Sequence, residues 1–235
     1  MQPAYTIFPL GDSALTIDFG NWIDEDLNEK VRQLFHQLRN VPPFLIDVIP
    51  AYSSLTLYYD AHALWTSETS AFEAMKRLIE PLIAKDFQKE LVQKRVVTIP
   101  VCYSQKFALD LEELAKKNNL TKEEVIQLHT SKTYRVYMIG FLPGFAYMGK
   151  VDDRIATPRR VQPRKLVPGG AVGIAGEQTG IYPLASPGGW NIIGRTPLKL
   201  FDTNREEATL LQSGDEISFY SITEDEFEDY QSRTT

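Results

Sequence analysis

Residues 137–149 read "YMIGFLPGFAYMG", and the interpretation of the second half of the chain depends on this stretch. It contains three Gly, one Pro, two Phe, two Tyr and two Met, and it carries no charge. Glycine allows the backbone to adopt positive φ or to approach a ligand closely, and proline fixes a loop in advance. Bulky apolar side chains among so many glycines therefore indicate either an unusual core strand or the wall of a site.

The same composition continues through residues 158–190 and 191–201. For any single residue, an aromatic core position or a surface ion pair is the simpler interpretation. Loops dense in glycine and aromatic residues are, however, where sites tend to be built, and Arg159, Arg160 and Arg164 can bind carboxylate or phosphate through paired hydrogen bonds. The set as a whole therefore predicts a surface that binds substrate or a partner. Its members are Phe141, Pro143, Gly144, Phe145, Tyr147, Gln178, Tyr182, Ser186, Gly188, Gly189 and Trp190.

Three further residues are candidates for catalysis. Arg195 follows "GGWNIIG" among apolar neighbours, and it is expected to pair with a substrate carboxylate or an acidic intermediate. His129 precedes a loop rich in Ser, Thr and Lys, where it can carry a proton near neutral pH. A lone histidine at a helix end also caps carbonyl groups, so this structural role stays open. Tyr137 lies in the strand that follows and is expected to share the proton handling.

Composition and charge exclude several classes of protein. The 235 residues are 43% hydrophobic and 24% charged, which suits one or two globular domains, and the net charge of −6 argues against a nucleic-acid binder. With one cysteine, Cys102, and three widely separated histidines, no disulfide and no metal site are expected. No signal peptide and no apolar run of the ~20 residues that a membrane helix needs are visible. The sequence predicts a cytoplasmic protein that does not bind membranes.

The first 90 residues predict a small α+β sandwich with the order ββαββα and both helices on one face of the sheet. A helix is expected from about Asp24 to Asn40, because apolar residues recur there along one stripe. A second helix is expected over 67–87, with a kink or an early break at Pro81. The charged segment 84–95 is the expected linker. The strand-like runs are "YTIF", "ALTIDF", "LIDVIPAY" and "SLTLYYD".

The rest of the chain, residues 91–235, predicts a mostly β domain that carries the site. Two short helices are expected after the strand "VVTIPVCY", because Asp110 with Glu113 and Thr121 with Glu124 have the capping-box spacing. Short β runs broken by Gly and Pro then favour a closed barrel or a sandwich. These runs are "YRVYMIGF", "AVGIAG", "TGIYPL", "WNIIGRT", "LKLF" and "EISFY". The acidic tail 222–235 is expected to be solvated or frayed.

Standard catalytic motifs are absent from the sequence. It contains no phosphate-binding loop of the G-x-x-x-x-G-K-[ST] type, no G-x-G-x-x-G that opens a helix, and no G-x-S-x-G nucleophile elbow. A nucleotide-binding loop within this chain is therefore not expected.

Three segments carry a resemblance to a known family: "PLGDSALTIDFG" (9–20), "YMIGFLPGFAYMG" (137–149) and "VPGGAVGIAGEQTGIYPLASPGGWNIIGRTP" (167–197). The chain resembles, from about Tyr5 to Tyr220, the family of the bacterial 5-oxoprolinase B subunit, allophanate hydrolase subunit 1 and the sporulation kinase inhibitor KipI. The resemblance implies a small N-terminal α/β domain and a C-terminal cyclophilin-like β-barrel. A cyclophilin-like fold does not by itself imply prolyl isomerase activity.

The resemblance also implies a function within a complex. The B subunit is expected to work with two partners, a carboxyltransferase-like C subunit (also named subunit 2) and a lactam-utilisation A subunit. Together the three are expected to convert 5-oxoproline to glutamate with ATP. ATP is expected to be bound mainly by, or shared with, the partner subunits, and this chain alone is expected to be inactive.

Two other functions remain open on the sequence. The family's kinase inhibitor docks its β domain on a sensor histidine kinase, and the carboxyltransferase components of allophanate hydrolase and urea carboxylase share the same motifs. If "GFLPGF" lies at an interface, Phe145→Asp is expected to weaken partner binding.

Overall fold

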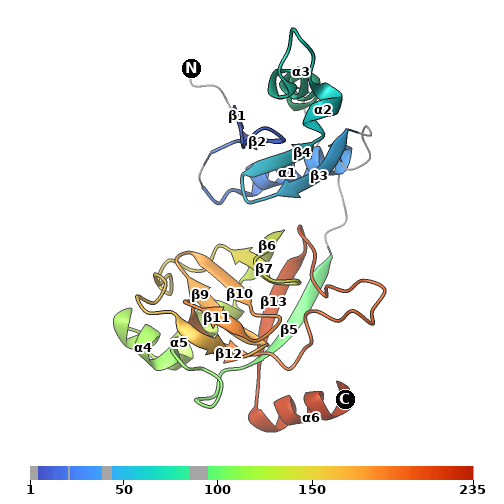
Figure 1. Cartoon of the computed structure of the whole chain (residues 1–235). Helices are drawn as coiled ribbons and strands as arrows, with labels where there is room; N and C mark the ends of the chain where they lie inside the picture. The colour runs from blue at the N-terminus through green and yellow to red at the C-terminus, as the bar shows by residue number, and fades with distance from the viewer. Residues whose placement is uncertain (1–4, 21, 39–43, 85–94, 235) are drawn as a thin grey trace. The chain divides into compact units, whose positions relative to one another are not determined.

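The computed structural model describes residues 5–20, 22–38, 44–84 and 95–234. The chain divides into two compact units, residues 1–92 and 93–235, and each is described by itself (Figure 1). The predicted boundary near residue 90, and most of the predicted linker, fall in residues 85–94, which lie outside the described residues.

The first unit is built on an antiparallel sheet with the strand order β1-β2-β4-β3. Because side chains alternate along a strand, Leu15 and Ile17 of β2 point to one face, where they are fully buried, whereas Thr16 bonds Thr56 of β4 on the other face. The strands are β1 (Thr6–Pro9), β2 (Ala14–Asp18), β3 (Leu45–Pro50) and β4 (Ser54–Tyr59).

In the described residues of this unit, three helices accompany the sheet: α1 (Glu25–Leu38), α2 (Ala61–Leu64) and α3 (Ala71–Ile83). The buried side chains of α1 and α3 join those of the sheet in one apolar core. The predicted end of the first helix, Asn40, lies outside the described residues.

The prediction for the second helix was wrong at its start. The hydroxyl of Ser70 accepts a hydrogen bond from the backbone N–H of Glu73, so α3 begins after Ser70 rather than at residue 67. A separate turn of helix, α2, precedes it. Pro81 does not end the helix, which continues to Ile83; a proline this close to the C-terminus removes only one hydrogen bond of the ladder.

The main sheet of the second unit closes on itself as a β-barrel, with the order β10-β7-β6-β13-β5-β12-β9 among the described residues. β9 pairs with β10 and completes the ring, and β5 and β13 are parallel neighbours. The barrel strands are β5 (Val96–Cys102), β6 (Thr133–Ile139), β7 (Ala146–Gly149), β9 (Ala171–Ala175), β10 (Gln178–Ile181), β12 (Asn191–Arg195) and β13 (Glu216–Ile222). β8 (Arg164–Val167) and β11 (Ser186–Gly188) form a separate two-stranded sheet that does not pair with the barrel strands.

Three helices belong to the barrel unit: α4 (Leu111–Lys117), α5 (Lys122–Thr130) and α6 (Glu224–Thr234). The capping box of Thr121 and Glu124 at the start of α5 is confirmed. At α4, Asp110 occupies the N-cap position but makes no side-chain cap hydrogen bond. Alternate residues along the barrel strands point inward and fill the core. Val136, Ile174 and Phe219 are examples.

One prediction for the end of the chain was wrong, and a second holds only in part, because the acidic tail is largely exposed as predicted but is helical rather than frayed. "LKLF" is not a strand; Phe201 forms only an isolated bridge with Thr209. The acidic tail forms α6, because Thr223 and Glu226 cap its start reciprocally and Phe227 is buried against Phe107.

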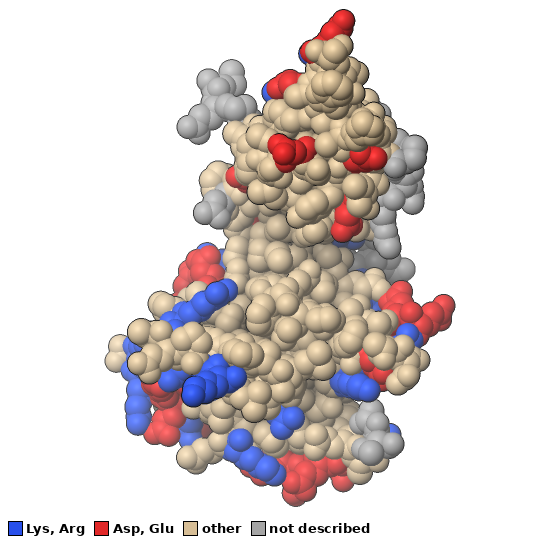
Figure 2. All heavy atoms as spheres, viewed as in Figure 1, with Lys and Arg blue, Asp and Glu red and all other residues tan. Residues whose placement is uncertain are grey.

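No helix in the described ranges is long and apolar enough to cross a membrane. Figure 2 shows basic and acidic side chains both spread over this face of the barrel unit, with acidic side chains gathered at its lower edge, where Figure 1 places α6.

Candidate functional site

An aromatic cluster forms on the outer face of the barrel. Ala146 and Met148 of β7 point into the barrel core, so the alternate residues Phe145 and Tyr147 point outward. The ring of Phe145 stands edge-on to Tyr182 and Trp190, at centroid distances of 5.2 and 5.5 Å. Tyr147 packs against Phe145 and Trp190, and Phe141 stands edge-on to Phe145 at 5.6 Å. The structure thus brings together predicted aromatic residues from two separate segments of the sequence.

Glycines provide the space for these rings. A Cβ on Gly180 of β10 would lie 3.0 Å from Trp190 and 3.1 Å from Phe145, and a Cβ on Gly173 would lie 3.1 Å from Trp190. The two glycines face each other across the β9–β10 pair. At these two positions glycine therefore leaves room for the ring of Trp190, and Gly180 also for that of Phe145.

Most of this cluster is a second core rather than an open wall. Phe145 and Tyr182 are 1% exposed and Trp190 is 4% exposed, whereas Tyr147 is half-buried. Burial raises the pKa of both tyrosines, and the positive charge of Arg159 opposes this effect. The described cluster thus offers mainly Tyr147 to a ligand.

The "GFLPGF" loop has one outward-pointing aromatic side chain. Phe141 is 63% exposed and has φ of +69°, a conformation that costs free energy for a residue with a side chain. Pro143 is also exposed, and Gly144, with φ of +81°, is buried against Leu200 and Phe201. Phe145 cannot report on an interface as predicted, because its replacement by Asp would place a charge in the second core; Phe141 is the exposed phenylalanine of this loop.

The remaining predicted binding residues frame the cluster. Gln178 is half-buried in β10, and Ser186 is buried in β11, where its hydroxyl bonds the carbonyl of Pro187. Gly188 lies directly against the phenol of Tyr182. The carbonyl of Gly189 accepts a hydrogen bond of 2.8 Å from the N–H of Arg160.

Arg195 lies in a different cluster. Its guanidinium is 5.8 Å from the ring centroid of Phe107 and 5.9 Å from that of Phe227 in α6. Its Nε donates to the carbonyl of Gly169 at 2.8 Å, and burial lowers the pKa of the guanidinium. Nε is the one side-chain nitrogen of Arg195 with a hydrogen bond to a described residue, so its terminal nitrogens are free of acceptors there.

His129 is fully buried in the barrel unit, with both ring nitrogens engaged. Nε2 is 2.9 Å from the hydroxyl of Thr179, and Nδ1 is 2.8 Å from the hydroxyl of Tyr103. Because Thr179 donates its single proton to the carbonyl of Gly173, it accepts from Nε2–H, and Nδ1 then accepts from Tyr103. Burial lowers the pKa of His129 to about 3.

The expectation that His129 carries a proton near neutral pH is therefore corrected, since the imidazole is neutral and has no path to solvent. Its ring stacks on Phe219 at 4.5 Å, and its role is to complete the core. Tyr137 is 3% exposed and lies at an irregularity of the β6–β7 pairing. The structure does not bring Tyr137, His129 and Arg195 together in any cluster described above.

Asp110 organises the loop beside the aromatic cluster, a role that its sequence position did not reveal. The 2% exposed carboxylate accepts hydrogen bonds from Arg164 at 2.6 and 2.8 Å, from Arg160 at 2.6 Å and from the N–H of Ile192 at 2.7 Å. It therefore joins α4, β12 and the 158–164 segment. The only signal in the sequence was the density of arginines at 159–164, since the capping-box spacing pointed to another use.

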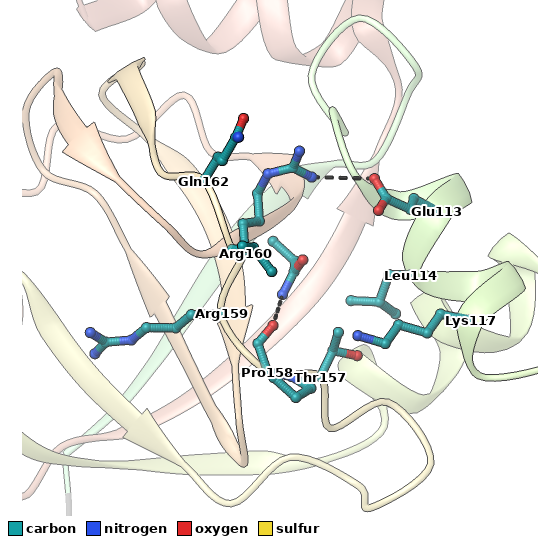
Figure 3. A pocket seen from close by; sticks show the side chains of 10 residues that line it. Glu113, Leu114, Lys117, Thr157, Pro158, Arg159, Arg160 and Gln162 are labelled. Atoms are coloured by element: carbon teal, nitrogen blue, oxygen red, sulfur yellow. Dashed lines mark hydrogen bonds and ion pairs between the residues drawn. The ribbon is translucent and has the colours of Figure 1, made fainter.

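A pocket of about 340 Å³ lies between α4 and residues 157–162 (Figure 3). Glu113, Leu114 and Lys117 line it from the helix, and Asn191 belongs to the β12 side. A second pocket, of about 410 Å³, lies in the N-terminal unit beside Trp65 and Phe72, and Asp12 is the one charged residue among the described residues that line it. No group of three His, Cys, Asp or Glu residues that could hold a metal ion occurs in the part of the chain that the structure describes.

The chain matches known proteins over most of its length. The family described as "Carboxyltransferase domain, subdomain C and D" matches residues 5–211. The chain is 44% identical to the 5-oxoprolinase B subunit of Bacillus subtilis (strain 168), over 98% of both chains. It is 36% identical to the 5-oxoprolinase B subunit of Escherichia coli O157:H7, over 89% of this chain and 93% of the relative.

Larger proteins contain a similar part. The chain is 26% identical to a putative urea carboxylase of Emericella nidulans and covers 21% of that protein. Among solved structures, TTHA0988 is 38% identical, with a TM-score of 0.76 over 89% of this chain. The chain spans 40% of that structure's length.

Proposed function

Because the chain belongs to the carboxyltransferase-domain family, subdomain C and D, and has close relatives named as the B subunit of 5-oxoprolinase, we propose that it is the B subunit of an ATP-dependent 5-oxoprolinase. The observation that carries this proposal is the 44% identity to such a subunit over 98% of both chains. The similarity to urea carboxylase is lower and covers a fifth of that relative, which does not favour a carboxyltransferase role.

The chain would act in a complex and would be inactive alone. An unstrained lactam resists hydrolysis, so the amide must be activated, here at the expense of ATP. The proposed partners are a carboxyltransferase-like C subunit and a lactam-utilisation A subunit. ATP would be bound mainly by these partner subunits or shared with them, and the complex would act in the cytoplasm. Phe141, exposed at a strained backbone position, is the proposed contact of the "GFLPGF" loop with a partner.

The two units would correspond to the two predicted domains. Residues 1–90 would be the small sandwich that the sequence pattern predicted as ββαββα, with α2 as an additional turn of helix, and residues 91–235 would be the cyclophilin-like barrel that the family resemblance implies. Separate expression of each part, followed by a test for cooperative unfolding, checks this division.

Arg195 is proposed to bind the substrate carboxylate. The rings of Phe107 and Phe227 and the carbonyl of Gly169 hold the guanidinium in place, while its terminal nitrogens stay free of acceptors among the described residues. A positioned guanidinium suits a carboxylate because two parallel N–H groups match its two oxygens. Tyr137 remains a predicted participant in proton transfer, without support from its buried position.

Reconstitution with the two partner subunits tests the function. The complete mixture is expected to hydrolyse ATP in a manner that depends on 5-oxoproline, and omission of this chain is expected to abolish that activity. Undiminished activity without this chain would contradict the proposal. Recovery of a histidine kinase as the bound partner, with no lactam-dependent turnover, would instead favour the inhibitor function.

The same assay tests Arg195. Arg195→Ala is expected to lower kcat/KM for 5-oxoproline roughly 10- to 100-fold, because a charge-assisted hydrogen bond to substrate is lost. Arg154→Ala is the matched control, since Arg154 is an exposed arginine that pairs with Asp152. Unchanged kcat/KM in an Arg195→Ala complex that still assembles would exclude this role.

A further inference from the structure

We propose that the pocket between α4 and residues 157–162 binds a small organic anion, a carboxylate or a phosphate, through Lys117 and Arg160. Its volume of about 340 Å³ is in the range of small-molecule sites. Figure 3 shows Lys117 extending from α4 across the pocket toward Thr157 and Pro158.

The side of the pocket opposite α4, formed by Thr157 and Pro158, is held in place by hydrogen bonds to neighbouring segments. Thr157 exchanges two backbone hydrogen bonds with Gly176, of 2.7 and 3.2 Å, and its hydroxyl accepts from Asn118 at 3.0 Å. The amide of Asn191 donates to the carbonyl of Pro158 at 2.9 Å. A wall fixed in this way needs little ordering when a ligand binds, so less of the binding free energy is lost.

The charges around the pocket leave two cations, Lys117 and Arg159, without a carboxylate partner among the described residues. The carboxylates of Asp110 and Glu113 are matched by the guanidiniums of Arg160 and Arg164. Lys117 has no carboxylate partner among the described residues, unlike Lys116, which pairs with Glu112 at 2.8 Å. Arg159 adds a further positive charge, although Figure 3 shows its side chain directed away from Glu113 and Lys117.

Arg160 supplies an independent indication. Its Nε–H is buried and has no acceptor in the described part of the chain. A buried donor without an acceptor costs free energy, and such a group in a folded protein calls for an explanation. Arg160 lines the pocket, and an oxyanion bound there would supply the missing acceptor.

The apolar lining residues also indicate the chemistry of the uncharged portion of the ligand. Leu114, Pro158 and Val161 provide apolar surface beside the two cations, which suits a small molecule with an apolar portion and one anionic group. The inference does not depend on the proposed function, because the site consists of residues of this chain alone. Its failure would leave the reconstitution assay unaffected.

Binding is measured on the isolated full chain by 15N NMR titration. The probes are 5-oxoproline, glutamate and inorganic phosphate, with 2-pyrrolidone as the neutral lactam control. At least one anionic probe is expected to saturate with a Kd at or below about 5 mM, shifting the Arg160 Nε–H signal and the amides of residues 113–117 and 157–162. A response to the carboxylates alone identifies a carboxylate site, and a response to phosphate alone identifies a phosphate site.

Two variants of equal charge test the specific role of Lys117. Lys117→Gln is expected to raise Kd at least about 5-fold, whereas Lys116→Gln, one residue away and paired with Glu112, is expected to leave it unchanged. Thermal unfolding of both variants verifies that each is folded. Absence of saturable binding by every anionic probe, equal binding of 2-pyrrolidone, or equal effects of the two substitutions would overturn the proposal.

Discussion

At the scale of single residues, Gly188 occupies a position where the ring of Tyr182 leaves no room for a side chain. Its Cα lies against the phenol of Tyr182, so a methyl group there would overlap the ring. Tyr182 cannot move aside easily, because it is 1% exposed and packs edge-on against Phe145. At Gly189, the next residue, a Cβ would lie 3.7 Å from the nearest atom, which is an ordinary van der Waals contact.

Gly188→Ala is therefore expected to lower the free energy of unfolding by about 1–3 kcal/mol, the usual cost of overpacking. Gly189→Ala is the matched control and is expected to change it by less than about 1 kcal/mol. Urea denaturation of both variants measures the difference. Equal stabilities would mean that Tyr182 is not confined as the structure shows.

The residue scale also shows where prediction from sequence succeeded. The expected association of aromatic residues is found for Phe145, Tyr147, Tyr182 and Trp190. Their burial was not predictable, because which face of β7 is covered depends on β12 and on the β8–β11 sheet, which are distant in sequence.

At the scale of secondary-structure elements, the starts of α4 and α5 share the residue spacing of a capping box but are stabilised by different interactions. Thr121 caps α5 reciprocally with Glu124, an interaction between residues three apart. Asp110 at the start of α4 instead holds Arg160 and Arg164, some 50 residues further along. A local sequence pattern therefore identifies the cap at Thr121, whereas the pairing of Asp110 with the two arginines becomes visible only in the folded chain.

The energetic consequence differs accordingly. Thr121→Ala is expected to cost about 1 kcal/mol of unfolding free energy, as for a lost helix cap. Asp110→Asn is expected to cost about 2–4 kcal/mol, because it removes the negative charge and replaces one of the two acceptor oxygens that the two guanidiniums and the N–H of Ile192 share with an NH2 donor. The partial exposure of the guanidiniums keeps the cost below that of a fully buried pair. Chemical denaturation compares the two. A cost for Asp110→Asn no larger than that for Thr121→Ala would show that Asp110 does not anchor the loop.

At the scale of the barrel unit as a whole, the buried His129 couples folding to pH. Its pKa is about 3 in the folded protein and near 6.5 in an unfolded chain, so protonation favours unfolding. The contribution of the neutral imidazole to the unfolding free energy is fully present above about pH 6.5 and is lost progressively as the pH falls toward 3.

Between pH 7 and pH 5.5 this group is expected to lower the unfolding free energy by about 1 kcal/mol. His129→Gln removes the titration while it retains a donor and an acceptor, so the variant is expected to lose this part of the pH dependence. Urea denaturation at the two pH values gives both differences, and the carboxylates contribute equally to parent and variant. An unchanged pH dependence in His129→Gln would show that the imidazole is not held neutral in the core.

The sequence by itself determined the alternating β runs, the helix stripes, the capping box of α5 and, through its glycine- and proline-rich segments, the family. These features depend on residues within a few positions of one another or on the order of short motifs. Only the tertiary structure decided that His129 is a neutral core residue, that Arg195 lies over Phe107 and Phe227, and that Asp110 joins a helix to an arginine loop. The physical reason is that burial and pairing arise when the barrel closes, since closure brings together strands whose separation in sequence carries no local signal.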